Sequence, residues 1–68
     1  MNQDAFNMSI RKFLKHVGVH SQREIESAVQ DAIAAGKLKG NEKLAATMTL
    51  SVGGVNLDVT FRDDITLE

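Results

Sequence analysis

Residues 45–62 read AATMTLSVGGVNLDVTFR, and this stretch decides the fold class. Apolar and polar side chains alternate on both sides of Gly53–Gly54, which is the period of a β-strand with one face against a core. Two adjacent glycines accept the positive φ angles of a two-residue hairpin turn. The stretch therefore predicts an antiparallel hairpin with strands at about 44–52 and 55–62.

A two-residue loop fixes the register of this hairpin. The apolar pairs that it predicts are Val52 with Val55, Leu50 with Leu57, Met48 with Val59 and Ala46 with Phe61. Polar and small residues pair on the other face, and a slip by one residue would mix the two sets. Asp63 and Asp64 interrupt the alternation, so Ile65 and Leu67 either extend the second strand or form a short third strand.

Upstream of the hairpin, the apolar period changes to that of a helix. Over residues 3–17 the apolar side chains fall within a stripe about 100° wide, which is typical of a helix that faces a core. These side chains are Phe6, Ile10, Phe13, Leu14 and Val17. Gly18 follows at once, so we expect this helix, capped by Asn2 or Asp4, to end there in a left-handed glycine cap.

A second helix is expected at about 21–35. Ser21 followed by Glu24 matches the capping box, in which the two side chains satisfy exposed backbone amides at a helix start. The apolar face repeats at helical spacing through Ile25, Ala28, Val29, Ala32 and Ile33. Gly36 ends this helix, and residues 37–43 form a charged surface connector.

The apolar faces of these elements need one another, because a lone hairpin and a lone short helix are both marginal in water. We therefore expect a single α+β domain over residues 1–68. Its arrangement is a two-layer ααββ fold, in which a helical hairpin packs on one face of a two-stranded, or three-stranded, antiparallel sheet. A chain of 68 residues is near the lower limit for a self-sufficient core, so a homodimer is a reasonable hypothesis.

The composition excludes several classes of protein. Eight basic and nine acidic residues give a formal net charge of −1, so no global field attracts nucleic acid or an anionic membrane. The absence of cysteine argues against disulfides and thiolate metal sites, and it fits a cytoplasmic location. The chain has neither an apolar run that spans a bilayer nor a secretory signal, so we expect no membrane partner.

Candidate catalytic and metal-binding groups are few. His16 and His20 have the spacing of helical metal ligands, but the expected helix end at Gly18 separates them, so we predict no metal site. Gly53–Gly54 precedes a strand rather than a helix, which argues against a phosphate loop. No paired acid and base emerge from the sequence. We predict a protein that is not an enzyme and uses no cofactor.

The basic side of the first helix is the candidate interaction surface. Arg11, Lys12 and Lys15 surround Met8, which projects roughly opposite the apolar stripe. A methionine adapts to many partner shapes, and the cations steer acidic partners toward it. Two interpretations of this pattern stay open: a surface for an acidic protein partner, and a solvated helix face with one incidental methionine.

Nucleic-acid binding is the second interpretation of the same charges. Two helices followed by a hairpin resemble a winged helix-turn-helix, and Arg23, Lys37 and Lys39 would extend the basic face. The second helix, however, carries acidic residues near its start, and the hairpin tip has no lysine or arginine. The sequence therefore favours a protein partner over nucleic acid.

Five stretches of the chain read FNMSIRKFLK, VGV, SQREIE, GKL and MTL. They resemble a group of short proteobacterial proteins that is defined only as a domain of unknown function, and the resemblance is clearest through the two helices. It implies a stand-alone, cytoplasmic bacterial protein and supplies no activity, ligand or partner. The sequence as a whole predicts a small non-enzymatic protein-interaction module whose partner it does not identify.

Overall fold

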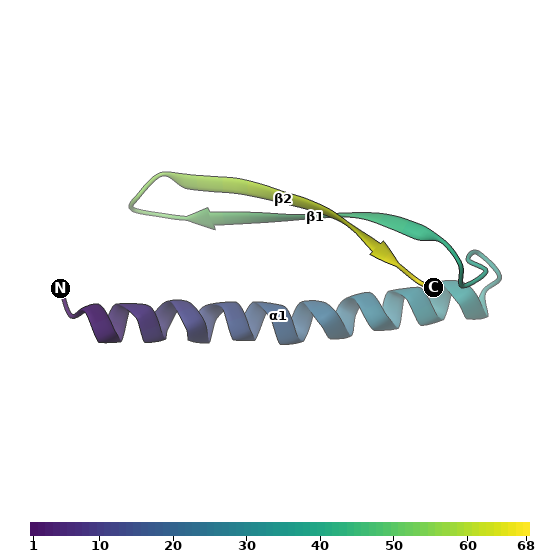
Figure 1. Ribbon diagram of the computed structural model, residues 1–68, viewed down its shortest axis with the longest axis horizontal. Helices are drawn as coiled ribbons and strands as arrows, with labels where there is room; N and C mark the ends of the chain where they lie inside the picture. The colour runs from purple at the N-terminus through teal and green to yellow at the C-terminus, as the bar shows by residue number, and fades with distance from the viewer. The chain divides into compact units, whose positions relative to one another are not determined.

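The computed structural model describes residues 1–68 and contains one helix and two strands. Figure 1 shows a long helix followed in the chain by an antiparallel hairpin. The elements are α1 at Gln3–Ala34, β1 at Lys43–Val52 and β2 at Leu57–Thr66. The chain divides into two compact units, Met1–Lys37 with the helix and Leu38–Glu68 with the hairpin. The protein is therefore α+β, as the sequence predicts.

The prediction of two helices is wrong, because α1 runs through Gly18 and Ser21 without interruption. Gly18 lacks the positive φ of a helix cap, and Ser21 lies in the helix interior, where no capping box forms. A glycine inside a helix costs only about 1 kcal/mol relative to alanine. Ending one helix and starting another leaves about four carbonyls and four amides to satisfy. The continuous helix is thus the less costly solution, and the helical hairpin is absent.

The two predicted apolar stripes become parts of one helix surface. At 100° per residue, the run from Ile25 to Ile33 is centred about 80° further round the helix than the run from Phe6 to Val17. The two runs overlap over part of their width. The apolar surface of α1 therefore winds around the helix rather than following a straight line.

At both ends of α1, backbone hydrogen-bonding groups are satisfied by residues that the sequence indicates as caps. The Asn2 side chain accepts a hydrogen bond of 3.0 Å from a backbone amide of the first turn, so Asn2 is the N-cap. Gly36 has a φ of +77° at the other end. Its amide donates to the Ile33 carbonyl at 3.0 Å, and the Lys37 amide donates to the Ala32 carbonyl at 2.8 Å. These are the paired bonds of a Schellman motif, and the predicted stop at Gly36 is confirmed.

The strands β1 and β2 pair antiparallel in a register that differs by two residues from the predicted one. Apolar pairs in the structure are Val52 with Leu57, Leu50 with Val59, Met48 with Phe61 and Leu44 with Ile65. Because the difference is an even number, every side chain keeps its predicted face. The separation of apolar and polar faces is confirmed, whereas the predicted pairs and turn are wrong.

The hairpin loop has four residues, Gly53–Asn56, rather than two. Gly54 has a φ of +89° and Asn56 a φ of +54°, while Gly53 keeps a negative or extended φ. Asparagine tolerates the left-handed conformation better than most residues with a side chain. Asn56 therefore closes a turn that the double glycine does not close by itself.

The far end of the hairpin explains why the longer loop is favoured. The predicted register would place Leu44 opposite Asp63, whereas the observed one places Leu44 opposite Ile65 and moves Asp63 opposite Ala46. β2 continues to Thr66, so Ile65 extends this strand and no third strand forms. Asp63 lies on the otherwise apolar face as a result of the strict alternation.

No residue in either unit is buried. The apolar face of the hairpin and the apolar surface of α1 both remain accessible in part, with Met48 and Phe61 among the exposed hydrophobic residues of the hairpin. The predicted packing of a helical layer on the sheet stays a prediction.

Candidate interaction surface

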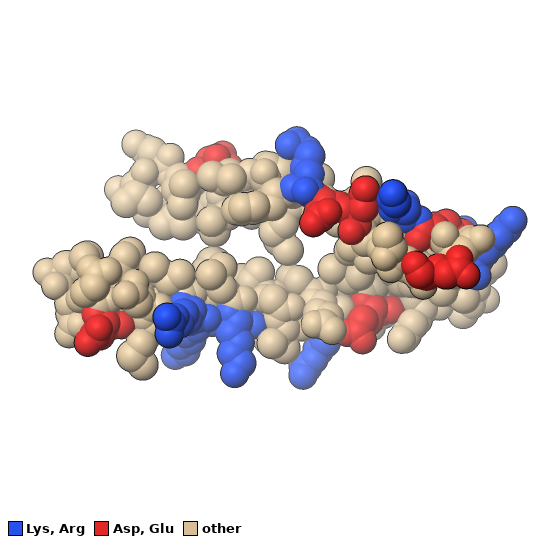
Figure 2. Space-filling view, viewed as in Figure 1, with Lys and Arg blue, Asp and Glu red and all other residues tan.

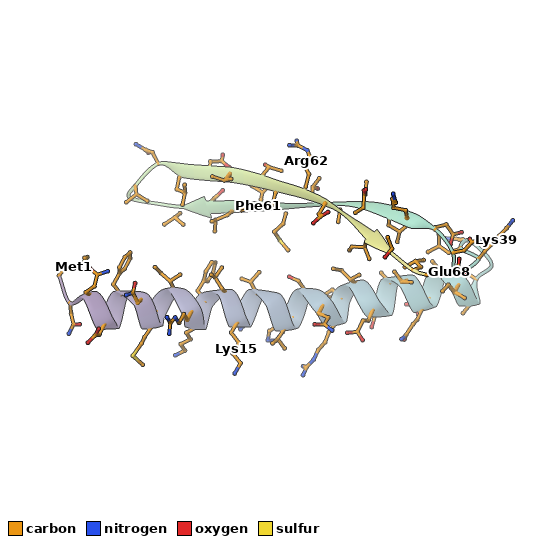
Figure 3. All side chains as sticks on the ribbon, in the orientation of Figure 1. Met1, Lys15, Lys39, Phe61, Arg62 and Glu68 are labelled. Atoms are coloured by element: carbon orange, nitrogen blue, oxygen red, sulfur yellow. The ribbon has the colours of Figure 1, made fainter.

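The four residues of the candidate surface lie together on α1. Met8, Arg11, Lys12 and Lys15 occupy positions i, i+3, i+4 and i+7 of one helix, which places them on one face across two turns. All four are exposed. Figure 2 shows the lysines and arginines of the helix along one side, and Figure 3 shows Lys15 projecting outward from it. We call these four residues the basic face.

The cations of the basic face have no acidic neighbours along the helix. No Asp or Glu lies three or four residues before or after Arg11, Lys12 or Lys15, which are the positions that pair on a helix surface. No acidic side chain of the helix is therefore positioned to pair with these cations. The first acidic residue that follows is Glu24, more than two turns beyond Lys15.

Met8 is the one apolar residue of the basic face. Its side chain is 69% exposed, more than any other large apolar side chain of α1. A thioether in this position can bury against a partner without leaving a polar group unpaired. The face thus combines one adaptable apolar contact with three unpaired cations.

The structure brings together two residues that the sequence prediction separates. His16 and His20 lie on one uninterrupted helix, and their ring centroids are 4.5 Å apart with the planes inclined at 53°. The expectation that Gly18 separates these rings is wrong, because α1 continues through Gly18. Their spacing of four residues is the signal in the sequence, and the expected helix end and the absence of cysteine argue against a metal site there.

One polar cluster in the loop before β1 has no counterpart in the sequence prediction. The Glu42 carboxylate accepts hydrogen bonds from the backbone amides of Lys39 at 2.8 Å, Gly40 at 2.9 Å and Asn41 at 3.2 Å. The bonds from Lys39 and Gly40 contribute most to lowering the pKa of Glu42 below its usual value. These three bonds tie the Glu42 side chain to the backbone of the loop before β1.

A comparison with protein families identifies the chain. The model of a family of unknown function, DUF6494, matches residues 1–68, and the protein belongs to this family. No curated protein and no solved structure matches the chain.

The hydropathy of α1 distinguishes it from a membrane span. No part of this helix is apolar enough over a sufficient length to cross a bilayer.

Proposed function

We propose that this protein is a non-enzymatic protein-interaction module, and that the basic face of α1 docks an acidic segment of a partner protein. One observation supports this proposal above the others. On one face of α1, Met8 lies one turn before Arg11 and Lys12 and two turns before Lys15, and these three cations have no acidic neighbour at pairing distance on the helix. Complementary charge would speed the encounter, and burial of Met8 would contribute to affinity.

The proposal can be tested with a labelled poly-glutamate peptide as the probe of an acidic partner. We expect binding that weakens as salt is raised, because the contact depends on exposed charges. Lys12→Glu should lower the affinity, whereas Gln30→Glu, which adds an acidic group at an exposed helix position beyond this face, should have a smaller effect. Equal affinity of the wild type and Lys12→Glu would refute the proposal.

Met8 separates a protein partner from nucleic acid, the alternative interpretation of these charges. Met8→Ala removes apolar contact area and keeps all three cations, so it should weaken a protein contact. Binding to phosphates depends on the cations and on counterion release, so duplex DNA would bind Met8→Ala and wild type alike. The nucleic-acid interpretation would be favoured if the protein bound duplex DNA more tightly than the peptide and if Met8→Ala left the DNA affinity unchanged. The helix-turn-helix on which that interpretation drew is not present in this chain.

We further propose that the module is a homodimer through the apolar surface of α1. Phe6, Phe13 and Leu14 are each about half exposed, on the side of the helix away from the basic face. Burial of a phenylalanine or leucine side chain stabilises an assembly by about 1.5–3 kcal/mol when it is complete. Two copies related by a two-fold axis would bury this surface twice and leave both basic faces free.

Sedimentation equilibrium from low to high micromolar concentration tests the homodimer. Phe13→Glu should shift the protein toward monomer, and Lys12→Glu, which adds an acidic residue on another side of the same turn, should leave the dimer intact. A wild type that stays monomeric at high micromolar concentration would rule out the homodimer and leave the peptide test unaffected. A bacterial origin and a cytoplasmic location are part of the same proposal, on the basis of the sequence.

A further inference from the structure

α1 presents two imidazole rings one turn apart. His16 and His20 are exposed, and their ring centroids lie 4.5 Å apart. The hydrogen bonds made by side chains in this chain involve other residues, so both rings keep their nitrogens free. Positions four apart on a helix project to the same side, and this arrangement positions two histidines for one metal ion in helical metal sites.

We propose that His16 and His20 chelate a divalent late first-row metal ion, namely Zn²⁺, Ni²⁺ or Cu²⁺. Neutral imidazole is a preferred ligand of these ions, and affinity rises along the series toward Cu²⁺. No group of three or more potential ligands exists in the chain, so the two histidines are the only protein ligands and water fills the other positions. Mg²⁺ and Ca²⁺, which require oxygen ligands, are excluded from this site.

The ion would hold α1 together at its weakest point. Gly18 lies midway between the two ligands, and glycine has the lowest helix propensity apart from proline. A metal ion bound to both rings links the turn before Gly18 to the turn after it. Because the unfolded chain does not hold the rings at this spacing, ion binding favours the helical state.

Isothermal titration of the full chain with NiCl₂, ZnCl₂ or CuCl₂ tests the chelate, with MgCl₂ as the negative control. We expect one bound ion per chain, and a loss of about tenfold or more in affinity in His16→Ala or His20→Ala, which equals about 1.4 kcal/mol. The matched control is His20→Ala combined with Ser21→His. It keeps two histidines but places them about 140° apart around the helix, so it should bind as weakly as the single variants. Wild-type affinity in a single variant or in this control would overturn the proposal.

Circular dichroism during urea unfolding tests the effect on the helix. Saturating Ni²⁺ should raise the unfolding midpoint of the wild type and leave that of His16→Ala unchanged. Gly18→Ala should still bind the ion but should gain less helix from it, since the weak turn is already repaired. An unfolding midpoint that does not respond to Ni²⁺ in the wild type would overturn the inference, whatever the titration shows.

Discussion

Replacement of Gly18 by alanine should stabilise the protein, and the sign of the effect depends on the continuity of α1. Gly18 lies inside the helix without a positive φ, and a Cβ added there meets no atom within 4 Å. No steric clash or strained φ therefore reduces the gain in unfolding free energy, which should equal the full difference in helix propensity between glycine and alanine of about 0.8–1.0 kcal/mol. For a chain of this size, such a gain corresponds to an increase of roughly 4–8 °C in Tm.

Gly36→Ala is the matched control for this substitution. A Cβ at Gly36 also meets nothing within 4 Å, but the φ of +77° is one that alanine adopts at a cost of about 1–2 kcal/mol. Chemical and thermal unfolding followed by circular dichroism should thus show opposite shifts for the two variants. If Gly18→Ala destabilises the protein as Gly36→Ala does, Gly18 is a helix cap, and the continuous helix is refuted together with the histidine pair.

Three further predictions concern the hairpin and the loop before it. Cysteines that replace Thr49 and Thr60, whose hydroxyl oxygens are 3.3 Å apart across the strands, should form a disulfide readily on oxidation. Faster oxidation of a cysteine pair at positions 49 and 58, which face each other in the predicted register, would instead support the two-residue loop. Asn56→Gly should be close to neutral and Asn56→Val should destabilise by about 1–2 kcal/mol, because the φ of +54° suits glycine and opposes a branched side chain; equal unfolding free energies would contradict the turn. The pKa of Glu42 is lowered in the folded state. The hydrogen bonds of its carboxylate therefore stabilise the loop fully at a pH above the ordinary pKa of 4.5, and this stabilisation is lost as the pH falls through the lower pKa of the folded state. Amide hydrogen exchange in this loop should follow that change in the wild type and show no such change in Glu42→Gln.

Much of the hairpin could be predicted, because the alternation of apolar and polar side chains fixes the face on which each strand residue lies. The face of every strand residue follows from a period of two, and an error of two residues in register leaves each face unchanged. The loop length could not be predicted from Gly53–Gly54 alone. It depends on the pairing of Leu44 with Ile65 at the other end of the hairpin and on the left-handed conformation of Asn56.

The helix shows the limit of local signals more clearly. Gly18 and Ser21 are a stop signal and a start signal three residues apart, and both are overruled by the continuous ladder of backbone hydrogen bonds in α1. Gly36 carries the same signal as Gly18 and does end the helix. The two glycines differ in the residues downstream of them, because helical periodicity resumes after Gly18, whereas a charged connector and a strand come after Gly36.

The candidate surface does not depend on whether the helix ends at Gly18. Its four residues lie before Gly18, so their common face was already predictable from helical spacing alone. The histidine pair was not predictable in the same way, because it lies across the glycine. Any property that depends on both sides of Gly18 requires the structure.

Asp63 has a consequence for how copies of the hairpin can stack. A two-stranded sheet has two unpaired edges, and this one also has an exposed apolar face. Together these features promote the growth of fibrils. Face-to-face packing of two such sheets would bury the Asp63 carboxylates between them, where their loss of hydration would cost several kcal/mol each. Asp63, on the apolar face of β2, should therefore oppose such stacking, and Asp63→Val should form fibrils sooner than the natural chain.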